Sequence, residues 1–296
     1  MVSTSSTGAT TADQPLLRIA IPNKGSLSTA ASDILREAGY RQRADSKELS
    51  LLDAVNGVEF FYLRPRDIAL YVGEGTLDVG ITGRDLLLDS GSKAEEVRRL
   101  GFGRSRFRFA ARPGTLSSLD ELAGKRIATS YVGVVRRHLE ERGIDAEVIR
   151  LDGAVETSIQ LGVADVIADV VETGSTLKAA GLEIVGEVIM ESEAVLITRA
   201  GGPEPTGFEV FKRRLDGVLV ARTYVMMDYD IPESAVEQGV ALTPGLEGPT
   251  MSPLHREGWV AVRAMVPRDG AQQLMDDLYE IGARAILLTD IHACRL

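Results

Sequence analysis

Short apolar runs alternate with stretches of helical apolar spacing along the first 200 residues of the chain. The runs LLRIAIP (Leu16–Pro22), LDVGIT and KRIATS have the composition of buried strands. Segments such as STAASDILREAGY follow them, with apolar residues at every third or fourth position and a glycine near the end. Strands that alternate with helices predict an α/β architecture with largely parallel sheets.

Two long extended segments interrupt this alternation, at Leu100–Gly114 and Glu187–Gly202. Two such crossings around a compact block predict a two-lobed core of the periplasmic-binding-protein type. We place lobe one at residues 15–106 with 194–206, and lobe two at 107–193. Ligands of open α/β sheets bind at the carboxyl ends of the strands, so we expect a binding cleft between the lobes.

The pattern changes after the Pro/Gly-rich linker GGPEPTG. Residues 207–296 read as a separate domain with the βαββαβ order of ferredoxin-like, ACT-like folds, in which TPGLEGPTMSP is a loop. At the other end, residues 1–14 are small and polar and predict a disordered tail.

Composition narrows the class of protein. The formal net charge of −10 argues against nonspecific binding to nucleic acid or to an anionic membrane. The single cysteine, Cys294, excludes an intramolecular disulfide. No apolar run approaches the length of a membrane span, and the N-terminus lacks a secretory signal, so a cytoplasmic location is expected. The three histidines lack metal-ligand spacing, and His138 is expected on a helix surface.

The stretch ADVIADVVETGSTLKAAG (Ala164–Gly181) carries the most specific chemistry. A buried strand delivers Thr-Gly-Ser-Thr to the start of a helix, where hydroxyls and unpaired N–H groups favour a phosphate. Asp169 and Glu172 lie just upstream and suit ribose hydroxyls or a divalent cation. The turn has no lysine and is therefore not a GxxxxGK[ST] nucleotide loop. The simpler alternative is an ordinary helix cap.

Seven segments in a fixed order resemble the long form of the ATP phosphoribosyltransferase family, and the resemblance extends from Leu17 to Leu296. They are LRIAIPNKGSL, GITGRDLL, KRIATSY, LDGAVE, LGVADVIADVVETGSTL, PGLEGPT and GARAILLTDI. The resemblance implies transfer of the 5-phosphoribosyl group of phosphoribosyl pyrophosphate (PRPP) to N1 of ATP, with Mg²⁺ and release of pyrophosphate. It further implies the first step of histidine biosynthesis, feedback inhibition by histidine, and assembly into dimers and hexamers.

The resemblance also implies roles for individual residues. The expected catalytic residues are Lys24, Asp169 and Glu172. PRPP is expected at Thr173, Gly174, Ser175 and Thr176. ATP or pyrophosphate is expected at Gly25, Arg64, Arg84, Tyr131 and Glu156. Histidine is expected at Asp230, Leu246, Thr250 and Ala285, and strand alternation places Asp228 on the same face as Asp230.

One departure from the family pattern concerns the acids. Many phosphoribosyltransferases carry two adjacent acids before the Thr-Gly turn, whereas here the spacing is DVVE. The protein groups that hold the metal are therefore left open, and pyrophosphate itself is a candidate.

Two other functions fit parts of the pattern. A non-catalytic two-lobed solute-binding or sensor protein would have the same crossings and cleft. A purely regulatory subunit would keep the C-terminal domain without the chemistry, although the segments ETGST and NKGSL argue against it.

Overall fold

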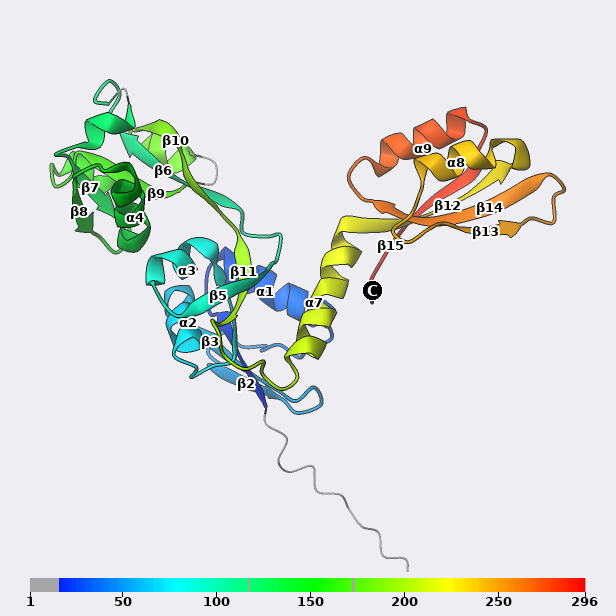
Figure 1. The fold of residues 1–296 in the computed structure, drawn as a ribbon, viewed down its shortest axis with the longest axis horizontal. Helices are drawn as coiled ribbons and strands as arrows, with labels where there is room; N and C mark the ends of the chain where they lie inside the picture. Colours follow the sequence, from blue (N-terminus) through cyan, green and yellow to red (C-terminus); the bar gives the residue numbers. More distant parts are fainter. Residues whose placement is uncertain (1–15, 117, 172–173, 296) are drawn as a thin grey trace, which may run out of the picture. The chain divides into compact units, whose positions relative to one another are not determined.

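Figure 1 shows a computed structural model of the protein, which describes residues 16–116, 118–171 and 174–295. The predicted tail at residues 1–14 and two predicted site residues, Glu172 and Thr173, lie outside the described residues. The chain forms two compact units, Met1–Asp33 with Arg41–Phe208 and Ile34–Tyr40 with Glu209–Leu296. Each is described by itself.

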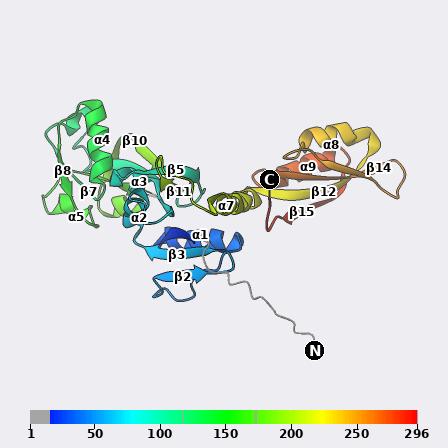
Figure 2. The ribbon, with the colours of Figure 1, turned by 60° about the horizontal axis from the view of Figure 1, so that its bottom comes forward.

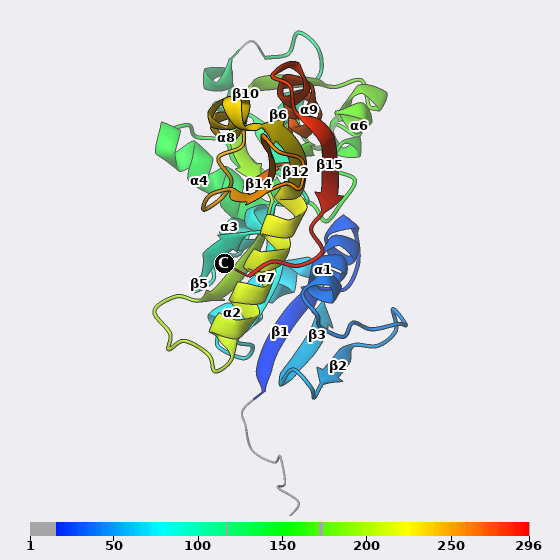
Figure 3. The same cartoon turned by 90° about the vertical axis from the view of Figure 1, so that its right-hand side faces the viewer.

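The first unit contains a six-stranded sheet that corresponds to lobe one. Its order is β2 (Ser50–Asp53), β3 (Val58–Leu63), β1 (Leu17–Pro22), β4 (Val79–Gly83), β11 (Ala194–Arg199) and β5 (Ala94–Arg99). Its helices are α1 (Ser26–Glu37), α2 (Pro65–Gly73) and α3 (Arg84–Ser90). Figure 3 shows β1, β3 and β2 side by side.

A five-stranded sheet forms the other lobe of this unit. Its order is β10 (Glu183–Ser192), β6 (Ser105–Ala111), β9 (Val166–Val171), β7 (Arg126–Thr129) and β8 (Glu147–Arg150). The helical segments between these strands are η1 (Leu119–Leu122), α4 (Val132–Arg142), α5 (Thr157–Gln160) and α6 (Ser175–Ala179). Figure 2 shows α4 beside β7 and β8, and α4 contacts β8.

Both sheets are mixed, so the expectation of largely parallel sheets is only partly right. Parallel pairing is confined to β3–β1–β4 in one sheet and β9–β7–β8 in the other. The remaining pairs are antiparallel because β2 closes a short hairpin with β3 and because β6, β10 and β11 run through the crossings.

The two crossings run beside each other between the sheets. The amide of Leu100 donates to the carbonyl of Ala194 at 2.9 Å, and the amide of Ala194 donates to the carbonyl of Phe102 at 2.8 Å. Figure 1 shows β6 and β10 leading from one lobe toward β11 in the other. The predicted two-lobed α/β fold is confirmed, while the exact limits of the lobes stay predictions.

His138 is buried, so the expectation of a helix-surface histidine is wrong. It lies on the same side of α4 as Val134 and Val135, and its ring packs 5.6 Å from that of Phe109 between the centroids. Burial lowers the pKa of His138, with the Arg142 charge acting in the same direction. The ring therefore belongs to the core of lobe two.

The second unit has the predicted βαββαβ order. Its elements are α7 (Phe208–Thr223), β12 (Tyr224–Pro232), η2 (Glu233–Ala235), α8 (Val236–Leu242), β13 (Thr250–Pro253), β14 (Trp259–Pro267), α9 (Ala271–Glu280) and β15 (Arg284–Asp290). The antiparallel sheet has the order β13-β14-β12-β15. The segment TMSP, expected in a loop, forms the edge strand β13, whose four residues are all exposed.

Helices α8 and α9 cover one face of this sheet (Figure 1). Alternate residues of β12, from Val225 to Ile231, are buried beneath them together with Leu278 of α9. Asp228 and Asp230 occupy the opposite face, as the strand pattern predicts.

The last residues of α1 and the residues just after it, Ile34–Tyr40, belong to this second unit. The ring of Tyr40 lies 5.3 Å from that of Phe211 between the centroids, and Glu37 pairs with Arg222 of α7. In the part of the chain that the structure describes, no helix has the length and apolar character needed to cross a bilayer.

Candidate active site

A hollow of about 230 Å³ lies in the first unit, lined by residues of both lobes. Its walls come from the β1–α1 turn, the β4–α3 turn, the first crossing and the segment before α4. The lining residues are Lys24, Gly25, Ser26, Leu27, Pro65, Gly83, Asp85, Leu86, Gly103, Ser105, Tyr131 and Val170. Three residues predicted for the site, Lys24, Gly25 and Tyr131, therefore meet here.

The β1–α1 turn gives this hollow an electropositive wall. Gly25 has a φ of +80°, which favours glycine, and its carbonyl accepts a hydrogen bond from the amide of Ser28 at 3.1 Å. Helix α1 starts at Ser26, so its first, unpaired N–H groups lie at the hollow beside the Lys24 side chain. The arrangement suits an anion.

Asp85 also lines this hollow and was not among the predicted site residues. Its carboxylate is buried and accepts a hydrogen bond from the Ser192 hydroxyl at 2.9 Å, while the Asp85 amide donates back to that hydroxyl at 3.0 Å. The hydroxyl of Tyr131 also donates to Asp85, and burial together with the Asp85 and Asp169 charges raises the Tyr131 pKa. The phenol therefore stays protonated.

The two arginines of LRPRD have different surroundings. Arg64 is exposed, precedes α2 and does not line the hollow. Arg66 lies over the Tyr131 ring, with 5.1 Å from its guanidinium carbon to the ring centroid. Arg66, rather than Arg64, therefore contacts the Tyr131 side of the cleft.

The last residues of β9 bring a half-buried acid, Asp169, to the same region. Burial is the main cause that raises the pKa of Asp169 from its ordinary 3.8 to about 6. The charges of Glu156 and Asp85 act in the same direction, while the hydrogen bond from the amide of Val170 opposes it. The charges of Glu156 and Asp85 are thus each close enough to repel an ionised Asp169.

We expect the raised pKa of Asp169 to make the free energy of unfolding depend on pH. Between pH 3.8 and about 6 the native state binds more protons at Asp169 than the unfolded chain, so its contribution to stability is lost as pH rises. Asp169→Asn avoids this loss. In metal-free buffer, the free energy of unfolding should shift in favour of the variant by about 2 kcal/mol between pH 4 and pH 7, since the partly exposed carboxyl is screened.

Thermal unfolding of both proteins across this range measures the shift. A difference that stays constant with pH would show that Asp169 titrates like an exposed aspartate.

After Glu172 and Thr173, which lie outside the described residues, Gly174 has a φ of +74° and is followed by Ser175 and Thr176 at the start of α6. This helix has only five residues, so its dipole is weaker than the sequence pattern suggested. Phosphate binding here would depend on the hydroxyls and on the N–H groups of the turn.

The LDGAVE segment forms a strained loop. Gly153 and Ala154 have φ values of +89° and +48°, and α5 begins only at Thr157. The Ser130 hydroxyl stabilises the loop by donating a hydrogen bond to the Leu151 carbonyl at 2.7 Å. A positive φ at alanine is uncommon and is often found at functional sites. The loop leads to Glu156, whose charge acts on Asp169.

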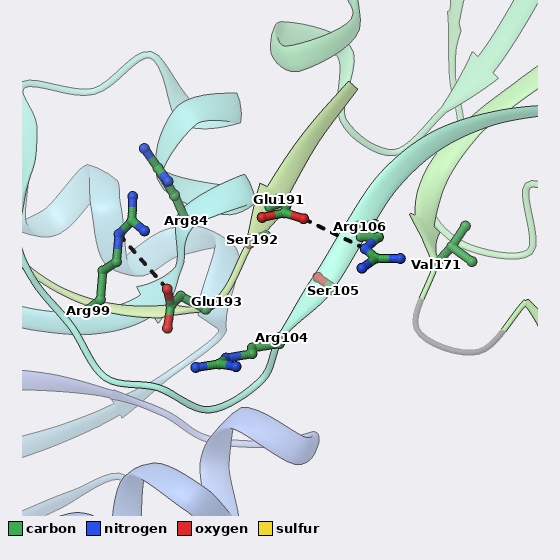
Figure 4. A pocket seen from close by; sticks show the side chains of 9 residues that line it. All are labelled: Arg84, Arg99, Arg104, Ser105, Arg106, Val171, Glu191, Ser192 and Glu193. Carbon is green, nitrogen blue, oxygen red and sulfur yellow. Dashed lines mark ion pairs between the residues drawn. The ribbon is translucent and has the colours of Figure 1, made fainter. Parts of the chain in front are cut away.

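Arg84 lines a second hollow of about 660 Å³ at the crossings, shown in Figure 4. Its lining residues are Arg84, Arg99, Arg104, Ser105, Arg106, Val171, Glu191, Ser192 and Glu193. Arg84 pairs with Glu96, Arg99 with Glu193 and Glu96, and Arg106 with Glu191. Arg104 has no ion-pair partner among the described residues. Ser105 lines both hollows, so the arginines adjoin the cleft.

Known proteins with the same sequence features decide the family. The sequence model of the family ATP phosphoribosyltransferase matches residues 64–217. The sequence model of the family HisG, C-terminal domain, matches residues 221–293. The ATP phosphoribosyltransferase of Streptomyces coelicolor is 66% identical over 285 residues, which cover 95% of this chain and all of that protein. The chain belongs to the ATP phosphoribosyltransferase family.

Further relatives agree with this assignment. The ATP phosphoribosyltransferase of Salinispora tropica is 60% identical over 282 residues, again 95% of this chain and all of that protein. Among solved structures, the ATP phosphoribosyl transferase (HisG:HisZ) complex from Thermotoga maritima matches with a TM-score of 0.60 and 27% identity, covering 69% of this chain and 98% of that chain. Family membership favours a transferase over the non-catalytic binding protein considered above.

The C-terminal domain has its own hollow of about 390 Å³ on the open face of the sheet. The lining residues are Asp228, Tyr229, Asp230, Thr250, Ser252, Ala261, Val262, Arg263, Ala285 and Leu287. Asp230, Thr250 and Ala285 are thus brought together, whereas Leu246 does not line the hollow. Asp228 pairs with Arg263 at 2.6 Å, and Asp230 has no ion-pair partner among the described residues.

A β-bulge shapes this hollow. The register between β12 and β15 shifts between Asp228 and Asp230, and Ala285 has a φ of +49° there. Bulges commonly lie at binding sites, where they redirect side chains and backbone groups. Position 285 is an alanine rather than a glycine or a proline, so the sequence did not predict this bulge.

Proposed function

We propose that the protein transfers the 5-phosphoribosyl group of PRPP to N1 of ATP and releases pyrophosphate, as the first step of histidine biosynthesis. The observation that carries the proposal is the cleft of a family member in which an electropositive turn, Lys24 and Gly25, lies with Tyr131 and the buried Asp85 in one hollow. The electropositive turn suits a phosphorylated substrate, and the Tyr131 ring suits an aromatic base.

PRPP is assigned to the turn after β9 and the neighbouring acids. Gly174, Ser175 and Thr176, with the undescribed Thr173, would bind the 5′-phosphate through N–H groups and hydroxyls. Asp169 and Glu172 would accept hydrogen bonds from the ribose hydroxyls. The partial burial of Asp169 supports this role, because the ionised carboxylate, which accepts a hydrogen bond from the Val170 amide, would be stabilised further by donors that a ligand brings.

ATP is assigned to the other side of the same cleft. Tyr131 would stack on adenine, and its fixed ring favours this because a rigid aromatic surface loses little entropy on binding. The arginine-lined hollow beside Ser105 suits polyphosphate. Arg104 has no ion-pair partner among the described residues, so it can bind phosphate without breaking an ion pair. Arg84 would exchange Glu96 for phosphate oxygens. The place of Arg64 stays a prediction from the resemblance.

The chemistry needs positioning and charge neutralisation rather than a protein nucleophile. As the bond from C1 of the ribose to pyrophosphate breaks, positive charge develops on the ribose and negative charge on the leaving group, and N1 of adenine attacks C1 directly. Lys24 and the N–H groups at the start of α1 would stabilise the leaving pyrophosphate. The carboxylates of the buried Asp85 and the half-buried Asp169 would keep the surroundings of the ribose negative.

Mg²⁺ is proposed to enter with the polyphosphate. Among residues 16–116, 118–171 and 174–295 no group of three or more metal-ligating side chains is assembled. Mg²⁺ bound in this way keeps several waters and takes phosphate oxygens with one or two carboxylates, which Asp169 and Glu156 would supply. Bound there, the ion would neutralise charge on pyrophosphate.

Histidine is proposed to bind the hollow of the C-terminal domain and inhibit the enzyme. Asp230 would pair with its ammonium group, and the Thr250 hydroxyl would bind its carboxylate. The bulge at Ala285 leaves only a methyl group beside the hollow. Leu246 would have to approach from the neighbouring loop, whose Gly245 and Gly248 both have positive φ. Dimers and hexamers are the proposed assemblies.

The test of the function is a spectrophotometric assay with ATP, PRPP and Mg²⁺, repeated with histidine. Product that forms only when both substrates are present supports the transferase. Binding of ATP or PRPP without turnover would instead favour a sensor or regulatory subunit.

We predict that Ser175→Ala and Thr176→Ala each weaken PRPP binding by about 10-fold or more, because a hydrogen bond to a charged group is worth about 1.5–3 kcal/mol. Calorimetric titration of PRPP measures the loss. Thr115→Ala, an exposed threonine of the same lobe, is the control and should bind PRPP normally. If both turn variants bind PRPP like the unchanged protein, the turn is only a helix cap.

A further inference from the structure

Asp89, at the end of α3, uses both of its carboxylate oxygens. One oxygen accepts hydrogen bonds from the amides of Gly133 and Val134 at 2.8 and 3.4 Å. The other pairs with the Arg66 guanidinium at 2.6 Å, and the Asp89 side chain is only 9% exposed. Asp89 and Arg66 belong to lobe one, whereas the two amides belong to lobe two, so the carboxylate joins the lobes.

The amide bonds of Asp89 cap a helix from outside its own lobe. The first turn of α4 has N–H groups with no partner inside the helix, and the residue before it, Tyr131, makes no side-chain cap. Asp89 satisfies two of these donors and places a negative charge at the positive end of the helix dipole. The start of α4 is therefore held by lobe one.

Close packing of α3 on α4 supports this contact. The Arg137 guanidinium donates to the Leu88 carbonyl at 3.1 Å. A Cβ added to Gly133 would lie 2.5 Å from the carbonyl oxygen of Asp89, which is closer than real Cβ contacts. Glycine is the residue that permits this approach.

The same carboxylate also controls the surroundings of Tyr131, which immediately precedes α4. Arg66, held by Asp89, lies over one face of the Tyr131 ring at 5.1 Å. Phe107 packs edge-on against the Tyr131 ring at 5.2 Å between centroids, and Asp85 accepts a hydrogen bond from the Tyr131 hydroxyl. Without Asp89, both Arg66 and the backbone after Tyr131 lose their anchor.

We propose that Asp89 is a positioning residue that joins the two lobes and fixes Tyr131 for ATP. It does not touch substrate; it acts through Arg66 and through the start of α4. The link to ATP rests on the proposed function, whereas the contact between the lobes does not.

Amide hydrogen exchange tests the contact directly. The amides of Gly133 and Val134 lack a partner inside α4, so Asp89 is their acceptor among the described residues. Asp89→Ala should speed their exchange by about 10-fold or more, since a hydrogen bond to a charged group is lost. Asp89→Asn keeps an acceptor oxygen and should exchange nearly as slowly as the unchanged protein. Glu140→Ala, an exposed acid later in α4, is the matched control.

Kinetics test the positioning role. Asp89→Ala should raise the KM for ATP by about 10-fold or more while the KM for PRPP changes less than about 3-fold, because the anchor of Arg66 and Tyr131 is lost. Arg66→Met should reproduce the change in KM for ATP, and combining it with Asp89→Asn should add little, because both remove the same ion pair. Melting temperatures of all variants identify any that fail to fold.

Unchanged exchange at the α4 amides in a folded Asp89→Ala protein would overturn the contact. Equal rises in KM for both substrates, or strictly additive effects of the Arg66 and Asp89 variants, would overturn the positioning role. If the unchanged protein makes no product from ATP and PRPP, the proposed function fails, and the exchange measurement still decides whether Asp89 joins the lobes.

Discussion

Lys24→Met is expected to lower kcat/KM by about 100- to 1,000-fold, the typical loss when one group that stabilises a transition-state charge is removed. Methionine keeps most of the length of the side chain and removes the ammonium group. Since Lys24 is exposed in the free protein, we expect little change in melting temperature. The proposed role at the leaving pyrophosphate further predicts that kcat falls more than the KM for PRPP rises.

Steady-state rates at varied PRPP separate these two effects. Lys93→Met, an exposed lysine of the same lobe away from the hollow, is the control and should keep the activity of the unchanged protein. A loss of less than about 3-fold in Lys24→Met would show that the ammonium does not stabilise the leaving group. A rise in KM alone would reduce Lys24 to substrate binding.

Local patterns predicted those parts of the fold that depend on near neighbours in sequence. The strand β1, the helix α9 and the strands β12, β14 and β15 follow from apolar spacing and from turn residues. The edge strand β13 was missed because its residues TMSP are all exposed and carry no alternation of apolar and polar positions. His138 was placed wrongly because the polarity of an imidazole hides its position on the buried side of α4.

The cleft was harder to predict because its members come from distant parts of the chain. The sequence singles out Lys24 and Tyr131 within motifs, but their meeting depends on how the lobes fold. In GRD the arginine was the expected site residue, whereas Arg84 pairs with Glu96 and the buried Asp85 lines the cleft. Asp89 carries no local signal at all, because its partners are 23 residues before it and 44 and 45 residues after it.

Asp230→Ala is expected to weaken histidine binding by about 30-fold or more, because truncating one partner of a desolvated charge pair costs about 2–5 kcal/mol. The structure makes Asp230 the stronger candidate for the histidine ammonium. Its neighbour Asp228 is already neutralised by Arg263 at 2.6 Å, whereas Asp230 has no ion-pair partner among the described residues. A ligand ammonium at Asp230 therefore need not displace a cation of the protein.

Calorimetric titration of histidine measures this affinity, and inhibition is measured as the ratio of rates with and without histidine. Asp276→Ala removes an exposed carboxylate from α9 and serves as the matched control, which should bind histidine normally. Histidine binding to Asp230→Ala with the affinity of the unchanged protein would exclude Asp230 as the ammonium partner. If affinity is instead lost in Asp228→Ala alone, histidine takes the place of Arg263, and the ion pair between Asp228 and Arg263 is what it must break.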